Sequence, residues 1–370
     1  MGRVRAAHGG VSRLFAFLLL PAALSLPAQQ PETPVFATDV RLVTLPVTVK
    51  DADGAPVGDL ERGDFEILEA GVARRVAVFE RRTNRPLSVA LMLDTSLSTA
   101  IELRYERESA SRFLKNLLGR GSHPGDRAAV FSFSADVQVH QRFTRNRRAL
   151  ERALGSMRPE SGTSVYDAVR LASGELARRE GRRVIVMITD GGDTTSHWRF
   201  ADALRAAHDH EVAIYPLIVL PIQSDAGRNR GGEHALITLA RNSGGETFVQ
   251  QGAENLDVAF GEVLRNLRTQ YLLGFYPGTE GAQTKEVFRT LEIRAAPAGA
   301  VVLARSGYYA DPDEMALRPR AARDAPTSVR TIPQARGSGQ SGSEATPPPA
   351  KAKRSQPDGM RRPSIVRPGR

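Results

Sequence analysis

The fold is decided by the stretch Val89-Ala90-Leu91-Met92-Leu93-Asp94-Thr95-Ser96-Leu97-Ser98, in which an apolar run leads directly into a carboxylate and three hydroxyls. A run of this kind is typical of a strand that is buried on both faces of a parallel sheet. Asp94, Ser96 and Ser98 follow at alternate positions past the strand, so we expect their side chains to point into one crevice. In open α/β sheets, ligands bind in the crevice at the carboxyl ends of the strands.

Further apolar runs of strand length alternate with helical stretches along the chain. The runs are Ala128–Phe133, Val184–Ile188 and Val212–Leu220, and the helical stretches include Ile101–Leu118, Val165–Ala177 and Ala253–Thr269. In the last of these, Leu256, Phe260, Val263, Leu264 and Leu267 fall on one face at spacings of three and four. The pattern predicts an α/β fold over residues 86–269, with a doubly wound, mostly parallel sheet and helices on both faces (Rossmann-like).

The segments on either side of this unit have β character. Residues 29–85 and 270–313 contain short strand-like runs separated by turns. Neither segment is long enough to be stable alone, so we expect the two to pack together as one small β subdomain. Asp51-Ala52-Asp53-Gly54 resembles the start of a calcium loop, but position twelve of such a loop is Arg62 here. A hairpin turn is the better interpretation.

The N-terminus has the layout of a secretory signal peptide. Arg3, Arg5 and Arg13 precede the apolar run Leu14–Leu26, and small residues follow before Gln29. The run is short for a membrane-spanning helix, although an uncleaved anchor is the alternative. We therefore predict that residues 1–28 are removed and that the mature protein is secreted or periplasmic, without an integral membrane span. The absence of cysteine excludes disulfides, thiolate metal sites and cysteine nucleophiles.

The net charge of +10 belongs to the two ends of the chain. Three arginines and no acidic residues precede Gln29, and residues 314–370 hold 12 basic and 4 acidic residues, which leaves a net charge of −1 between them. A neutral body does not favour nucleic-acid binding. Residues 314–370 are rich in Pro, Ser, Gly and Arg and are predicted to be a disordered basic tail. The tail is either a solvated extension or a contact for anionic polymers of the cell envelope.

Two more oxygen-bearing side chains follow elements of the predicted sheet. Thr163 lies in the loop Ser161-Gly162-Thr163-Ser164 before a helix, and Asp190 ends the strand Val184–Thr189. Together with Asp94, Ser96 and Ser98 they form an all-oxygen set of two carboxylates and three hydroxyls. Hard cations prefer such a set, Mg²⁺ above all, with Mn²⁺ or Ca²⁺ as alternatives. The few carboxylates leave the cation electrophilic, so an Asp or Glu carboxylate of a partner protein would complete its shell.

The three motifs together resemble the metal-ion-dependent adhesion site of von Willebrand factor A (VWA) domains. The resemblance covers residues 86–269 and implies a VWA fold and a role in adhesion or scaffolding. It implies that Ser96 and Ser98 are direct ligands, that Thr163 binds directly or through water, and that Asp190 acts through water. It also implies that the helix Ala253–Thr269 shifts with the state of the site. The flanking motifs Leu60-x-x-x-Asp64-Phe65-Glu66-Ile67 and Arg305-x-Gly307-Tyr308-Tyr309 are similar to those of bacterial secreted VWFA-related proteins of the acidobacterial type.

Two other functions stay open at this point, a metal-free structural module and a metallohydrolase. A phosphatase nucleophile at Asp94 would need a second aspartate at position 96, where the chain has serine. Ser96 lacks the flanking glycines of a hydrolase nucleophile, and no histidine is placed to serve it. We therefore expect a binding protein and not an enzyme.

Overall fold

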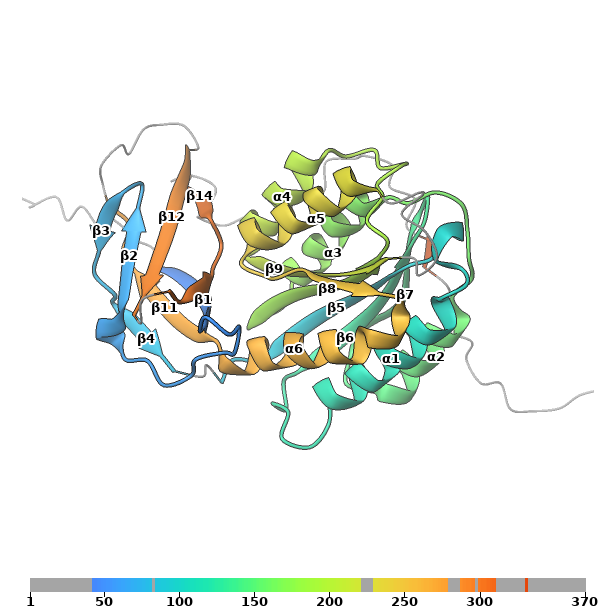
Figure 1. Cartoon of the computed structure of the whole chain (residues 1–370), viewed down its shortest axis with the longest axis horizontal. Coiled ribbons are helices and arrows are strands. Elements are labelled where there is room, and N and C mark those ends of the chain that lie inside the picture. Colours follow the sequence, from blue (N-terminus) through green and yellow to red (C-terminus); the bar gives the residue numbers. More distant parts are fainter. Residues whose placement is uncertain are drawn as a thin grey trace, which may run out of the picture.

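The computed structural model describes residues 42–81, 84–220, 229–278, 287–296, 299–310 and 330–331. The predicted signal peptide and most of the predicted basic tail lie outside these residues. The described chain forms an α/β unit and a smaller β unit that lie side by side (Figure 1). No helix within these ranges is apolar over a length sufficient to cross a membrane.

The α/β unit contains a seven-stranded sheet in the order β10-β9-β8-β5-β6-β7-β15. All neighbouring strands are parallel except β6 and β7, which are antiparallel. The two central strands, β5 and β8, are almost entirely buried, which explains their continuous apolar sequences. The strands are β5 (Leu87–Asp94), β6 (Arg127–Phe133), β7 (Val137–Thr144), β8 (Arg182–Thr189), β9 (Val212–Leu220), β10 (Phe248–Gln251) and β15 (Arg330–Thr331).

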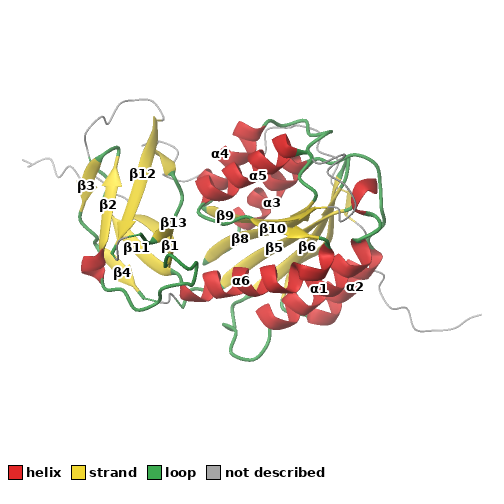
Figure 2. Ribbon diagram, in the orientation of Figure 1, coloured by secondary structure: helices red, strands yellow, loops and turns green. Residues whose placement is uncertain are grey.

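Helices cover both faces of this sheet (Figure 2). Alternate side chains of β5 face opposite layers: Leu91 belongs to the core cluster that contains residues of α1, α2 and α6, and Met92 to the one that contains residues of α3, α4 and α5. The predicted doubly wound α/β fold is therefore confirmed. The helices are α1 (Leu103–Leu117), α2 (Arg147–Ser156), α3 (Val165–Ala177), α4 (Phe200–Asp209), α5 (Arg230–Ser243) and α6 (Leu256–Thr269), with 3₁₀ turns η2 (Leu97–Thr99) before α1 and η3 (Ala253–Asn255) before α6.

Three strands of the sheet were not expected from the sequence. β7 and β10 lie toward the edges of the sheet and are only partly buried, so they lack the long apolar run that identifies a central strand. β15 comes from the segment that composition predicts to be disordered, and its two residues pair in parallel with Gln138 and Val139 of β7.

The β unit consists of two four-stranded sheets, in the orders β13-β1-β11-β4 and β14-β12-β2-β3. Each sheet combines strands from both flanking segments: β1 pairs antiparallel with β11, and β2 pairs antiparallel with β12. The predicted β subdomain of two distant segments is therefore confirmed. Its elements are β1 (Val43–Lys50), η1 (Arg62–Asp64), β2 (Phe65–Glu69), β3 (Val72–Arg74), β4 (Val78–Glu80), β11 (Tyr271–Phe275), β12 (Val287–Ala295), β13 (Val301–Leu303) and β14 (Gly307–Ala310).

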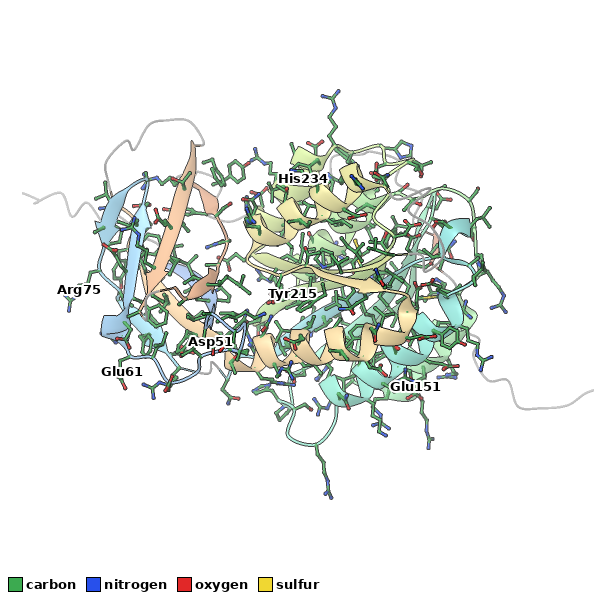
Figure 3. The ribbon with its side chains drawn as sticks, in the orientation of Figure 1. Asp51, Glu61, Arg75, Glu151, Tyr215 and His234 are labelled. Atoms are coloured by element: carbon green, nitrogen blue, oxygen red, sulfur yellow. The ribbon has the colours of Figure 1, made fainter. Side chains whose placement is uncertain are left out.

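The turn at Asp51 is a structural turn, as the sequence predicts. The Asp51 carboxylate accepts hydrogen bonds from the backbone N–H groups of Asp53 (3.0 Å) and Ala55 (2.8 Å). Gly54 has a φ of +83°, which side-chain-bearing residues rarely adopt. Asp51 thus uses its carboxylate to close the turn in the β unit, where Figure 3 labels it.

Polar contacts hold the two units together. Lys50 of β1 donates to both carboxylate oxygens of Glu246 (2.7 and 2.6 Å), and Asn266 of α6 donates to the same carboxylate (2.6 Å). The ring of His208 stacks on Phe288 with centroids 5.3 Å apart. Only one residue separates the end of α6 from the start of β11, so this helix leads directly into the β unit.

Candidate metal site

The two candidate carboxylates lie at the carboxyl ends of the two central strands. Asp94 is the last residue of β5, and Asp190 directly follows β8. These strands are parallel neighbours, and Leu93 of β5 is in register with Ile188 of β8. The pairing brings Asp94 beside Thr189 and places both aspartates at one edge of the sheet, in the crevice where α/β sheets bind ligands.

Two hydrogen bonds fix the Asp94 carboxylate. Its Oδ1 accepts from the backbone N–H of Ser96 (2.8 Å), and its Oδ2 accepts from the Thr189 hydroxyl (2.7 Å). The side chain is fully buried. The Thr99 hydroxyl donates to the backbone carbonyls of Asp94 (3.0 Å) and Ser96 (3.1 Å), which closes the loop into η2. The carboxylate is therefore held in one orientation by its own loop and by the neighbouring strand.

The two serine hydroxyls of the first loop lie against each other. Ser96 Oγ and Ser98 Oγ are 2.9 Å apart and share a hydrogen bond. Ser96 is buried, whereas Ser98 is exposed, so the pair connects the protein interior to the surface. Of the five predicted residues, Asp94, Ser96 and Ser98 are thus brought together by direct hydrogen bonds within one loop.

The second loop is joined to the first by backbone contacts. The Glu160 N–H donates to the Thr95 carbonyl (2.8 Å), and Ser96 and Glu160 form a parallel β-bridge. Gly162 has a φ of +80°, and this turn is followed directly by Thr163, which is 5% exposed. Thr163 follows in the same loop, and among the described residues it forms no hydrogen bond to Asp94, Ser96 or Ser98.

The loop after Asp190 is tied to the Thr163 loop. Thr163 N–H donates to the Thr194 hydroxyl (2.9 Å), and Thr194 N–H donates to the Thr163 carbonyl (2.8 Å). Asp193 Oδ1 accepts from the N–H of Val165 (2.8 Å), so this distant residue caps the start of α3. The three loops therefore form one hydrogen-bonded rim.

The side chain of Ser196 contacts the helix that precedes it in the chain. Ser196 Oγ accepts from the N–H groups of Tyr166 (3.1 Å) and Asp167 (3.2 Å) in α3, and α4 begins only at Phe200. Ser196 therefore caps α3, which precedes it, and not α4, which follows it, because its loop folds back onto α3.

The two carboxylates of the candidate site have no positively charged partner among the described residues. Burial is the main cause that raises the pKa of Asp94 to about 6, against the hydrogen bonds from Ser96 and Thr189, and the charge of Asp190 raises it further. Among the described residues, no Lys, Arg or His forms an ion pair with Asp94 or Asp190. A bound divalent cation would supply the missing charge, so the donor set fits such an ion.

The candidate site offers only two acidic ligands, Asp94 and Asp190, to a metal ion. Within the described residues there is no cluster of three or more His, Cys, Asp or Glu side chains placed to hold a metal ion. The candidate site depends instead on hydroxyl oxygens that accompany two carboxylates. Neutral hydroxyl ligands do not reduce the charge of a cation, which would stay attractive to a further carboxylate.

Sequence reasoning missed one buried acidic residue of α1, Glu106. It is fully buried on α1, and neither of its carboxylate oxygens has a hydrogen-bond partner among the described residues. The signal in the sequence is its position: Leu103, Ala110 and Phe113 occupy the same buried face of the helix. A single charged residue within an apolar helical face marks a side chain that packing alone does not explain.

Comparison with known proteins identifies the fold. Residues 89–192 match the family model for the von Willebrand factor type A domain, and the matched stretch contains all five candidate site residues. The α/β unit therefore has the VWA fold. No curated protein matches the chain. The narrower resemblance to secreted bacterial proteins of the acidobacterial type stays a prediction.

Several solved structures have a similar chain trace. The conserved hypothetical protein BatB from Bacteroides thetaiotaomicron is 20% identical with a TM-score of 0.39, over 48% of this chain and 98% of that one. The vWF domain of the type V pili tip protein Mfa5 from Porphyromonas gingivalis is 15% identical with a TM-score of 0.42, over 49% and 94%. The pilus adhesin SpaC from Lactobacillus rhamnosus GG is 11% identical with a TM-score of 0.41, over 67% and 48%. Likenesses at this level say nothing about what a chain binds.

Proposed function

We propose that this VWA-domain protein binds a divalent cation at Asp94, Ser96, Ser98, Thr163 and Asp190, and through it the carboxylate of a partner protein. The observation that carries the proposal is the orientation of Asp94, which Ser96 and Thr189 hold beside the paired hydroxyls of Ser96 and Ser98. Mg²⁺ is the favoured ion because it prefers oxygen ligands and keeps open positions for water or a partner. Mn²⁺ and Ca²⁺ are the alternatives.

The change from buried to exposed residues across the site would let a ligand bind from the solvent side. Asp94 and Ser96 lie at the buried base, and Ser98 is exposed at the mouth. A cation held there has protein oxygens on its inner side and water on its outer side. An Asp or Glu of a partner could replace such a water. The two protein carboxylates balance the charge of the ion without exceeding it, so a further carboxylate can still bind to the ion.

The surroundings of the two serines favour binding over hydrolysis. Ser96 Oγ bonds to Ser98 Oγ, and within the described ranges neither hydroxyl has a histidine partner. Both ring nitrogens of His140, Nδ1 of His197 and Nε2 of His208 bond to other residues. A serine without a general base is a poor nucleophile, so a role as ligand is the simpler one.

Export of the protein is part of the proposal and rests on the sequence of residues 1–28. The N-terminal sequence of the protein recovered from its native host tests it. A mature chain that begins near Gln29, found in the periplasm or medium, is the expected result. An intact N-terminus in the cytosol would contradict it, without affecting the proposed cation site.

The binding function itself is tested by capture on the immobilised full-length chain. Envelope and secreted proteins of the native host are applied in Mg²⁺ and eluted with a chelator, for the wild type, Asp94→Asn and the control Asp257→Asn. Asp257 is an exposed residue of α6 that pairs with Arg112. We expect a partner that the wild type and Asp257→Asn retain only with Mg²⁺ and that Asp94→Asn does not retain. Equal retention in chelator or by Asp94→Asn would contradict the proposal.

A further inference from the structure

Positive charge is concentrated between the end of β7 and the first half of α2. Residues 142–152 contain one acidic residue and five arginines, namely Arg142, Arg145, Arg147, Arg148 and Arg152. The stretch has a net charge of +4, whereas the chain between residues 29 and 313 has a net charge of −1. A nearly neutral body thus carries a strongly basic surface at one place.

The structure gathers most of these arginines around two adjoining hollows. The first hollow has a volume of about 590 Å³ and is lined by four arginines, namely Arg120, Arg145, Arg147 and Arg148. The second has a volume of about 660 Å³, shares Asn146 and Arg148 with the first, and continues to Arg152 and Glu151 (Figure 3). Arg120 comes from the loop after α1, so two segments of the chain supply the positive charges.

Hydrogen bonds of Arg145 hold the two sides of the first hollow together. Its guanidinium donates to the His123 carbonyl and to Ser122 Oγ, both at 2.6 Å. Ser122 Oγ donates in turn to the Gly119 carbonyl (2.7 Å). The loop that carries Arg120 is therefore fixed against the start of α2, and the hollow exists before any ligand binds.

The other three arginines of the first hollow have no acidic partner. Arg120, Arg147 and Arg148 are exposed, and nowhere in the described part of the chain do they form an ion pair. Arg147 and Arg148 are also the first two residues of α2, at the positive end of the helix, where cations are unfavourable. These charges do not stabilise the helix, so a bound anion explains them better than the fold does.

The chemistry of the hollows fits phosphate groups that follow one another along a chain. A guanidinium group binds phosphate through two parallel hydrogen bonds. Positive charges that extend over two adjoining hollows match several phosphates better than one. A membrane surface fits less well, because no large hydrophobic side chain is exposed between residues 118 and 152, all of which the structure describes.

We propose that the hollows at the start of α2 bind an anionic polymer whose phosphate groups repeat along its chain. They lie at the edge of the sheet opposite the candidate metal site. Asp94 is in register with Phe133, the last residue of β6, whereas Thr144 at the end of β7 pairs with Ala128 near the start of β6. The chain can therefore hold the polymer at one edge and leave the other free, and this binding does not depend on the proposed cation.

The test is binding of linear polyphosphate to the full-length protein, measured by calorimetry at low and at higher salt. Arg147→Gln/Arg148→Gln should raise the Kd about 10-fold and make binding less dependent on salt, because phosphate contacts are lost. Glu151→Gln removes the one acidic residue of the hollows and should lower the Kd about 2- to 5-fold. The charge-matched control Arg75→Gln/Arg104→Gln, at exposed arginines elsewhere, should retain the wild-type Kd.

The basic segment 314–370 is present in every variant, so any binding that it contributes is the same in all of them. Arg147→Gln/Arg148→Gln should melt at or above the wild-type temperature, because it removes cations from the positive end of a helix. A wild type that does not bind polyphosphate would overturn the inference. The same Kd in Arg147→Gln/Arg148→Gln as in the wild type, or an equal loss in the control, would also overturn it.

Vesicles of phosphatidylglycerol and phosphatidylcholine form the second arm of the test. We expect them to bind the full-length protein more weakly than polyphosphate does, with the same Kd for Arg147→Gln/Arg148→Gln and for the wild type. Tight binding to the vesicles that Arg147→Gln/Arg148→Gln removes, without binding of polyphosphate, would overturn the assignment to a polymer in favour of a membrane surface.

Discussion

The hydroxyl of Thr189 donates a 2.7 Å hydrogen bond to Oδ2 of Asp94, across the pair of parallel strands at the centre of the sheet. Both residues are 0% exposed. The second oxygen of Asp94 is held by Ser96 of its own loop. The carboxylate is therefore oriented before any ligand arrives, and the orientation depends on a residue that is itself no ligand.

Replacement of Thr189 by valine should weaken cation binding. The change keeps the shape of the side chain and removes the donor, so Asp94 loses one of its two hydrogen bonds in a buried place. We expect a loss of about 1 to 3 kcal/mol in the free energy of unfolding without metal. Cation affinity should fall about 10- to 100-fold. Thr189→Ser, which retains the hydroxyl, is the control, and urea unfolding with Mg²⁺ titration measures both effects.

Asp94 should make the metal-free protein less stable as the pH rises. Its pKa is about 6 in the folded chain, above the usual aspartate value of 3.8, so the folded state binds more protons between these pH values. The free energy of unfolding therefore falls by about 3 kcal/mol as the pH rises through that window. Asp94→Asn carries no charge at any pH and removes this loss. In chelator, the stability of Asp94→Asn relative to the wild type should increase from about pH 4 to about pH 7. A constant difference would contradict the assignment.

The Gly162 turn should be essential for the placement of Thr163. Gly162 has a φ of +80°, and a Cβ atom there would lie 3.0 Å from both Ala135 Cβ and Thr195 Oγ1. Gly162→Ala should cost about 1 to 2 kcal/mol of stability and lower cation affinity, since the loop must shift. Gly155→Ala is the matched control, because Gly155 lies in α2 with open space around its Cβ position. That change should stabilise the protein by about 0.5 to 1 kcal/mol.

The contact between the two units should depend on Lys50. Its side chain is 7% exposed and pairs with Glu246, which is 25% exposed and also accepts from Asn266 of α6. Lys50→Met leaves the carboxylate without its main partner and should cost about 2 to 4 kcal/mol, since Glu246 keeps some access to water. Arg104→Met, at an exposed pair with Glu108 on α1, should leave the denaturation midpoint nearly unchanged. Equal effects of the two changes would contradict a role for the Lys50 contact.

The sequence was sufficient to predict the fold class and the strand ends at which the two candidate carboxylates lie. Continuous apolar runs identify the central strands, and Asp94 and Asp190 stand where two of them end. Edge strands such as β7 and β10 were missed because partial burial leaves no such run. A strand that is buried on both faces requires apolar residues throughout, so its sequence identifies it.

The support of the site could not be predicted in the same way. The bond from Thr189 to Asp94 depends on the register between two strands that are distant in sequence. The capping of α3 by Asp193 depends on a loop that folds back over an earlier helix. The burial of Glu106 depends on the rotation of α1 against the sheet. Each is a consequence of tertiary packing, which a single sequence does not display.

Thermal unfolding of the full-length protein, first in chelator and then in millimolar Mg²⁺ or Mn²⁺, tests the central claim most directly. A ligand that binds only the folded state stabilises it, by about 2.7 kcal/mol at a hundredfold excess over the dissociation constant. We predict a rise in melting temperature that grows with cation concentration in the wild type and is absent in Asp94→Asn. The same melting temperature with and without the cation in the wild type, or an equal rise in Asp94→Asn, would contradict a cation site at Asp94.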